Sequence, residues 1–187
     1  MYRVALTLLA AAGIGGAGVV AFALQRVGVD QGYAPEQPVA FSHALHAGRH
    51  EIPCLYCHFG AEKSRHAGIP PSSVCMNCHA ELKLRTVEIA KLREAVAQDR
   101  PIAWVKVHNL PDFVYFNHSQ HVRVGGLDCR LCHGAVEKME RLSQEEPLTM
   151  GWCIECHRER GLAEPAATGE SGSLAGTGGT DCSRCHY

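Results

Sequence analysis

The hydrophobic residues of this chain are concentrated at its start. Between Val4 and Leu24 the sequence contains no charged side chain. As an α-helix this run would be about 31 Å long, which is enough to cross the hydrocarbon core of a bilayer. The run is longer than the apolar core of a signal peptide, although the small-residue pattern AFA at positions 21–23 is similar to a cleavage site. Residues 1–30 are therefore predicted to form an N-terminal transmembrane anchor, with a cleaved signal peptide as the alternative.

Only one later segment has a clear helical pattern. Apolar residues recur at helical spacing over residues 81–98, which predicts an amphipathic helix, and Pro101 follows its end. Residues 101–116 are rich in β-branched and aromatic side chains and predict a short strand or an extended segment. From Glu159 to Thr180 the chain is rich in Gly, Ala, Ser and Thr and too poor in apolar residues to fold alone. The pattern thus predicts a mainly α-helical chain with much irregular structure.

Composition changes this picture in two ways. Lys plus Arg number 18 and Asp plus Glu number 19, so the net charge of −1 argues against a nucleic-acid partner. After the anchor, conventional apolar residues are too few for an ordinary globular core of this size. The chain has instead ten cysteines and twelve histidines. This composition predicts an interior filled by something other than side chains.

Every cysteine belongs to one of five C-x-x-C-H motifs. This spacing is the attachment site of c-type haem, in which two thiols bond the haem and the adjacent imidazole ligates its iron. Zinc ribbons and thioredoxin-like sites also use C-x-x-C pairs, but neither requires a histidine directly after the second cysteine. The motifs predict a multihaem cytochrome c with five covalent haems, attached through Cys54, Cys57, Cys75, Cys78, Cys129, Cys132, Cys153, Cys156, Cys182 and Cys185. The expected proximal iron ligands are His58, His79, His133, His157 and His186.

The haem motifs also indicate where the chain lies. Attachment of c-type haem takes place on the outer side of the bacterial inner membrane. Arg3 and the terminal amine precede the apolar run, and the positive-inside rule then places the N-terminus in the cytoplasm. We therefore expect a single-pass protein of the bacterial inner membrane whose haem domain lies on the periplasmic side.

An internal repeat organises the haem motifs. FSHALH begins at Phe41 and FNHSQH begins at Phe116, and the same offset relates the first haem motif, at Cys54, to the third, at Cys129. The second and fourth motifs, at Cys75 and Cys153, follow with nearly the same offset. Fixed self-similarity of this kind indicates a duplicated structural unit. The expected divisions are haem module 1 over residues 31–105, haem module 2 over residues 106–160, and an extended tail over residues 161–187 that carries the fifth haem.

The repeated histidines are candidates for the distal iron positions. A second strong ligand closes the iron to substrates and leaves electron transfer as its chemistry. His43 and His46, and their counterparts His118 and His121, are spaced so that each pair can reach two neighbouring haems. His66 is the first candidate for the fifth distal position. The alternatives are Met139, Met150 and His108.

Several longer strings resemble one known family. FSHALH, KSRHAGIPPSSVCMNCH, VHNLPDFVYFNHSQHV, LTMGWCIECHR and DCSRCHY together resemble the pentahaem, membrane-anchored cytochrome c subunit of alternative complex III, and each half is similar to small cytochromes of the c7/c3 kind. The resemblance implies a quinol-oxidising respiratory or photosynthetic complex of a bacterial membrane. In it, this subunit would pass electrons from iron-sulfur subunits to a monohaem cytochrome c or another acceptor, with no substrate site of its own.

Two other functions are alternatives to an electron-relay subunit. A small membrane-anchored quinol dehydrogenase would oxidise quinol itself. Such proteins commonly have a methionine two residues after the haem-binding histidine, where this chain has Gly60, Glu81, Ala135 and Glu159. A multihaem reductase acting on a small substrate needs an open iron, which the surplus of histidines argues against.

Overall fold

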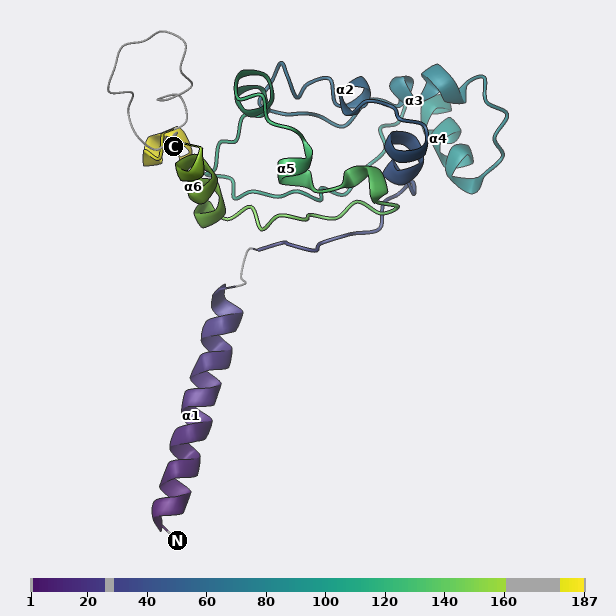
Figure 1. The fold of residues 1–187 in the computed structure, drawn as a ribbon. Helices are drawn as coiled ribbons and strands as arrows, with labels where there is room; N and C mark the ends of the chain where they lie inside the picture. Colours follow the sequence, from purple (N-terminus) through teal and green to yellow (C-terminus); the bar gives the residue numbers. More distant parts are fainter. Residues whose placement is uncertain (1, 26–28, 161–178, 187) are drawn as a thin grey trace, which may run out of the picture.

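The computed structural model describes residues 2–25, 29–160 and 179–186. Helix α1, Tyr2–Gln25, extends away from the rest of the described chain (Figure 1). Its segment Tyr2–Leu24 is long and apolar enough to cross a membrane, and none of that segment is buried against other residues. By length and composition alone, α1 meets the expectation of an anchor, and a signal sequence at this position would pass the same test.

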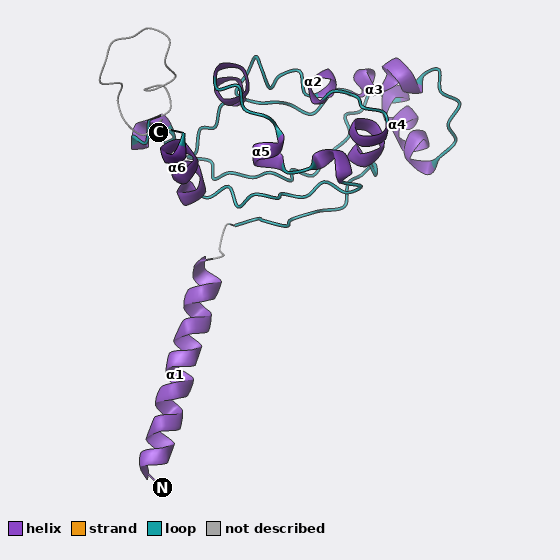
Figure 2. Ribbon diagram, viewed as in Figure 1, coloured by secondary structure: helices purple, strands orange, loops and turns teal. Residues whose placement is uncertain are grey.

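The rest of the described chain consists of short helices joined by long irregular segments, and no strand occurs in it (Figure 2). The longer helices are α3 (Ser72–His79), α4 (Val87–Ala97) and α6 (Met150–Glu159). The single turns are η1 (Ala44–Arg49), α2 (Cys54–Cys57), η2 (Gln120–Val124), α5 (Arg130–His133), η3 (Val136–Lys138) and η4 (Cys182–Arg184). The expectation of a mainly helical, largely irregular fold is confirmed.

Helix α4 begins later than the sequence pattern predicts. The helix expected over residues 81–98 spans only Val87–Ala97, because Thr86 adopts an extended conformation and caps it by accepting a hydrogen bond from the backbone N–H of Ile89. The residues before Thr86 are held by Arg93, whose guanidinium donates to the carbonyls of His79, Leu82 and Leu84. This arginine ties α4 to the end of α3.

The segment expected to be a strand or extended chain forms no strand. Val114 instead makes one isolated antiparallel bridge with His186, and the backbone N–H of Tyr115 donates to the carbonyl of Cys185 at 2.8 Å. These contacts attach the last haem motif to the middle of the chain. The expected Gly- and Ser-rich linker falls mostly on residues 161–178, which lie outside the described residues.

The two halves dock on each other reciprocally. The backbone N–H of Ala44, at the start of η1, donates to the carbonyl of Met139 at 2.9 Å. Ser119 is the repeat equivalent of Ala44, and its N–H donates at 3.1 Å to the carbonyl of Ser64, the repeat equivalent of Met139. Each half thus uses the same position to contact the same loop of the other half. Such exchange of equivalent contacts is what a local two-fold axis produces.

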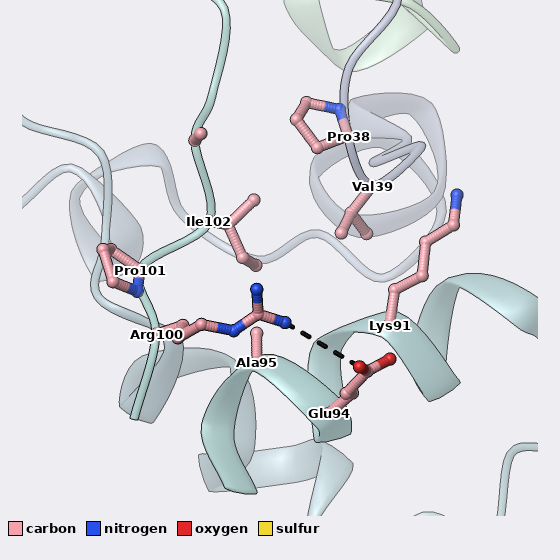
Figure 3. Close-up of a pocket in the computed structure, with 9 residues that line it drawn as sticks. Pro38, Val39, Lys91, Glu94, Ala95, Arg100, Pro101 and Ile102 are labelled. Carbon is pink, nitrogen blue, oxygen red and sulfur yellow. Dashed lines mark ion pairs between the residues drawn. The ribbon is translucent and has the colours of Figure 1, made fainter. Parts of the chain in front are cut away.

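Few apolar side chains are buried in this arrangement. Among the described residues the buried hydrophobic ones are Ala61, Leu92, Ala95 and Val107. A hollow of about 300 Å³ lies between α4 and the segments around Val39 and Ile102 (Figure 3). It is lined by no cysteine or histidine, so it is separate from the haem motifs. Contacts between side chains alone therefore do not explain how the middle of the molecule is organised.

Candidate haem-binding sites

The C-x-x-C-H motifs share one local conformation. In three of them the backbone N–H of the histidine donates to the carbonyl of the first cysteine: His58 to Cys54 at 2.9 Å, His133 to Cys129 at 3.0 Å, and His186 to Cys182 at 2.9 Å. This is one helical turn, which places the two thiols on one side and the imidazole beside them. The motif of α3 ends that helix, and the motif of α6 lies within it. None of the ten cysteines forms a disulfide bond with another.

Each F-x-H-x-x-H unit holds two imidazoles against one phenylalanine ring. Phe41 meets His43 edge-on at 4.9 Å and stacks on His46 at 4.3 Å. Phe116 meets His118 edge-on at 4.8 Å and stacks on His121 at 4.3 Å. The same ring arrangement thus recurs in both halves. The phenylalanine fixes the angle between the two imidazoles and lets them face different haem motifs.

Three of the repeated histidines face a proximal histidine across a gap that fits an iron. The ring centres are 6.1 Å apart for His46 and His79, 6.1 Å for His121 and His157, and 6.3 Å for His118 and His133. An imidazole nitrogen binds a first-row transition metal at about 2.0 Å, so two such bonds separate the ring centres by roughly 6 Å. The spacing lies toward the long end of the range for ring contacts, about 4.5–7 Å, and matches that of two imidazole ligands on one iron. The residues present therefore fit a haem with two histidine ligands.

His43 lies near the remaining motif of the first half, whose histidine is His58. Burial, followed by the nearby imidazoles of His58 and His46, lowers the pKa of His43 to about 4. Burial, followed by His108 and His118, lowers the pKa of His133 to about 4 as well. Both rings are therefore neutral near pH 7, as a metal-ligating imidazole must be. In the repeat, His43 and His58 form the pair equivalent to His118 and His133.

The hydrogen bonds of these rings leave the same nitrogen available. Nδ1 contacts a backbone carbonyl in five of the histidines: His46 with Ser42 at 2.8 Å, His58 with Gly68 at 2.7 Å, His118 with Arg65 at 2.9 Å, His121 with Asn117 at 2.8 Å, and His186 with Phe113 at 3.3 Å. A carbonyl only accepts, so Nδ1 carries the proton and donates. The lone pair is then on Nε2, the tautomer required for ligation through that atom.

Thiols of different motifs are near enough to shift one another's pKa. Burial, and then the thiol of Cys75, raises the pKa of Cys57. Burial raises the pKa of Cys129, and the next cause is Cys54, to which it is also hydrogen-bonded. Burial followed by Cys156 raises the pKa of Cys132 to about 11, and burial followed by Cys185 raises the pKa of Cys153.

These neighbours arrange the five motifs in one row, in the order second, first, third, fourth and fifth. Figure 1 shows the same order, with α3, α2, α5, α6 and the C-terminus following one another along the molecule. Cys54 and Cys129 are equivalent in the repeat and touch each other, so the local two-fold axis passes between the first and third motifs. The order in space therefore differs from the order in the chain.

The candidates for the fifth distal position are dispersed. His66 is exposed in the loop before α3, and its backbone N–H contacts the Ser64 hydroxyl. Met139 accepts a contact from the Ser143 hydroxyl at its sulfur, and Met150 is largely exposed at the start of α6. In the described residues no ring contact joins His66 to a proximal histidine. The distal partner of His186 thus stays a prediction.

His108 has a contact that the sequence interpretation missed. Its ring lies 4.4 Å from that of His133, and its Nε2 lies 3.1 Å from the Nδ1 of His133. This separation leaves no room for an iron between these two rings. Burial, followed by His118, lowers the pKa of His108. One signal was present in the repeat, because the equivalent position of the first half is Tyr33 and His108 is therefore not one of the repeated histidines.

Comparison with known proteins agrees with this geometry. Residues 114–187 match the family model described as "Cytochrome c7 and related cytochrome c". This segment holds the third, fourth and fifth C-x-x-C-H motifs. The chain carries a multihaem cytochrome c domain. Covalently bound haem c is accordingly its cofactor, as the motifs predicted.

A curated relative extends the likeness beyond that domain. The chain is 29% identical over 157 residues to the "Menaquinone reductase, multiheme cytochrome c subunit" of Nitratidesulfovibrio vulgaris strain Hildenborough. The alignment covers 81% of this chain and 68% of that protein. The similarity therefore spans most of both halves of the repeat.

Proposed function

We propose that this chain is a pentahaem electron-relay subunit of a quinone-linked complex in a bacterial membrane, of the alternative complex III type. When bound, c-type haem supplies one-electron chemistry at its iron. The chain's own residues supply thioether attachment, two imidazoles at each of four irons, and a contiguous row of attachment sites. The observation that carries the proposal is the set of ring pairs at 6.1–6.3 Å, because closed irons exclude substrate ligation.

The row of motifs supports a relay with two ends. The second motif, in α3, lies at one end, and the fifth motif, beside Val114, lies at the other. We assign one end to an iron-sulfur subunit and the other to a cytochrome c or another acceptor. The helix α1 would hold the row against the membrane subunits, with the haem domain on the periplasmic side. His66 remains the proposed fifth distal ligand, and magnetic circular dichroism lacking a His/Met band would support it over either methionine.

The name of the curated relative favours electron transfer in the opposite direction through the same relay, toward the quinone. That protein is named as a subunit of a menaquinone reductase, so a complex containing the present chain could deliver electrons to menaquinone rather than withdraw them from quinol. The haem potentials separate the two directions. A mean potential well below that of the menaquinone couple supports menaquinone reduction, and a mean potential above it supports quinol oxidation.

The test is purification of the full chain from membranes in mild detergent. We expect five haem c per chain by the pyridine haemochrome assay, membrane and iron-sulfur subunits among the co-purifying chains, and no carbon monoxide binding at the four paired sites. Carbon monoxide binding at several haems would contradict the closed-iron geometry. Recovery of the chain alone, with quinol dehydrogenase activity, would replace the relay by a quinol dehydrogenase that acts by itself.

A further inference from the structure

The proximal histidine His133 has a hydrogen-bond partner of a different kind from those of His58 and His186. The Nδ1 of His58 and that of His186 each contact a backbone carbonyl, whereas the Nδ1 of His133 contacts the Nε2 of His108 at 3.1 Å. The rings of His133 and His108 are nearly perpendicular, at 83°. On its other side His133 faces His118 with the ring planes almost parallel, at 7°. His133 is thus held between a distal partner and a second imidazole.

The direction of this hydrogen bond follows from ligation. A neutral imidazole that binds iron through Nε2 carries its proton on Nδ1, so His133 donates and His108 accepts at Nε2. An imidazole nitrogen is a stronger acceptor than an amide carbonyl. A stronger acceptor on the outer nitrogen makes the ligand more basic and favours the more highly charged metal ion. The oxidised iron is then stabilised more than the reduced iron.

His108 is positioned for this contact by its own segment. Val107, directly before it, is one of the few buried apolar residues, and Val105 exchanges two hydrogen bonds of 2.9 Å with the side chain of Gln37. These contacts fix the extended chain that brings His108 to α5. The first half has no equivalent, because Tyr33 occupies the corresponding position and His58 bonds Gly68.

We propose that His108 is a positioning residue for the third haem, accepting a hydrogen bond from the ligand His133 and lowering the reduction potential of that haem. The proposal rests on the proposed function, in which Cys129, Cys132 and His133 hold a haem. The proposal concerns only His108, the residue that forms a hydrogen bond with the ligand His133. The third haem lies at the centre of the row, beside the local two-fold axis.

The test compares two substitutions in the full chain. In His108→Leu the acceptor is lost, whereas in His108→Gln the side-chain oxygen can accept near the position of Nε2. Potentiometric titration resolves the five haems as separate one-electron components. We expect His108→Leu to raise one component by about 59 mV, which is a tenfold change for one electron, and His108→Gln to raise it by less than half as much. Tyr33→Leu, at the equivalent position of the first half, is the matched control and should move none.

Two results would overturn the proposal. Either His108→Leu leaves every reduction potential unchanged, or His108→Gln raises the potential as much as His108→Leu does, which would indicate an effect of packing alone. The haem content distinguishes a failure of the proposed function from a failure of the role proposed for His108. A wild-type chain with no haem at Cys129 and Cys132 contradicts the proposed function, whereas five haems with unchanged potentials contradict only the role of His108.

A second measurement needs no substitution. In the reduced, ¹⁵N-histidine-labelled chain, a scalar coupling across the hydrogen bond should join the Nδ1 of His133 to the Nε2 of His108. The iron with two histidine ligands is then diamagnetic, so the signals are observable. The absence of this coupling, with other ligand histidines resolved, would rule out the hydrogen bond even if the substituted chains fail to assemble.

Discussion

The two halves of the haem domain have the same ligand geometry and different surroundings. The phenylalanine-to-histidine ring distances are 4.9 Å and 4.3 Å around Phe41, and 4.8 Å and 4.3 Å around Phe116. The Nδ1 atoms of equivalent histidines differ in their hydrogen-bond partners. His118 donates from Nδ1 to the carbonyl of Arg65, whereas the Nδ1 of His43 is buried and has no hydrogen-bond partner among the described residues. The duplication thus preserved the arrangement of the phenylalanine and its two histidines and changed the hydrogen bonds of those histidines. In the proposed function, this difference would make equivalent haems unequal.

The largest expected effect comes from removing one equivalent proposed distal ligand in each half. His118→Ala and His43→Ala should each open a single iron, because His118 faces His133, and His43, its repeat equivalent, lies near His58. Carbon monoxide titration should show about one binding haem in five for either variant and none in the wild type. His50→Ala, which removes an exposed histidine outside the pairs, should bind none.

Equal carbon monoxide binding by His118→Ala and His43→Ala would support the two-fold relation between the halves. Carbon monoxide binding by only one of these variants would contradict the two-fold relation, because the first and third sites would then not share a ligand arrangement.

A smaller effect is expected where the halves dock. A Cβ added to Gly48 would collide with the backbone carbonyl of Glu137, at the contact between η1 and η3. A backbone atom cannot move aside without distorting the chain. Gly48→Ala should therefore lower the free energy of unfolding by about 1–3 kcal/mol. The equivalent position of the second half is the exposed Arg123, and Arg123→Ala should change it by no more than about 0.5 kcal/mol. Guanidinium unfolding followed in the Soret band measures both.

A neutral Gly48→Ala would show that η1 does not dock on η3 as closely as described. A large effect of Arg123→Ala would show that the second half docks through contacts absent from the first.

The sequence predicts the parts of this architecture that depend on the spacing of residues close together in the chain. C-x-x-C-H predicted the haem attachment sites, and the repeated F-x-H-x-x-H predicted the two histidine pairs, whereas the contact of each pair with its phenylalanine ring appeared only in the structure. The order of the motifs in space could not be predicted, since it depends on Cys54 meeting Cys129 across the two-fold axis. The helix over residues 81–98 was predicted too long because periodicity does not register the extended backbone of Thr86.

His108 illustrates the same limit at the level of one residue. Histidine in a haem protein suggests an iron ligand, and only the fold shows that its Nε2 faces another imidazole. Its position has no histidine in the other half, which shows that His108 belongs to neither repeated pair.

The smallest expected effect concerns the phenylalanine shared by each histidine pair. Phe41→Leu and Phe116→Leu keep an apolar side chain but lose the stacked and edge-on contacts, which are worth about 0.5–1.5 kcal/mol in such ring pairs. Because the four ring contacts have nearly the same distances and angles in both halves, the two substitutions should lower the free energy of unfolding equally. Electron paramagnetic resonance should show two haem signals broadened in each variant, since one phenylalanine orients ligands of two irons. Broadening of one signal only would mean that the two imidazoles are oriented independently.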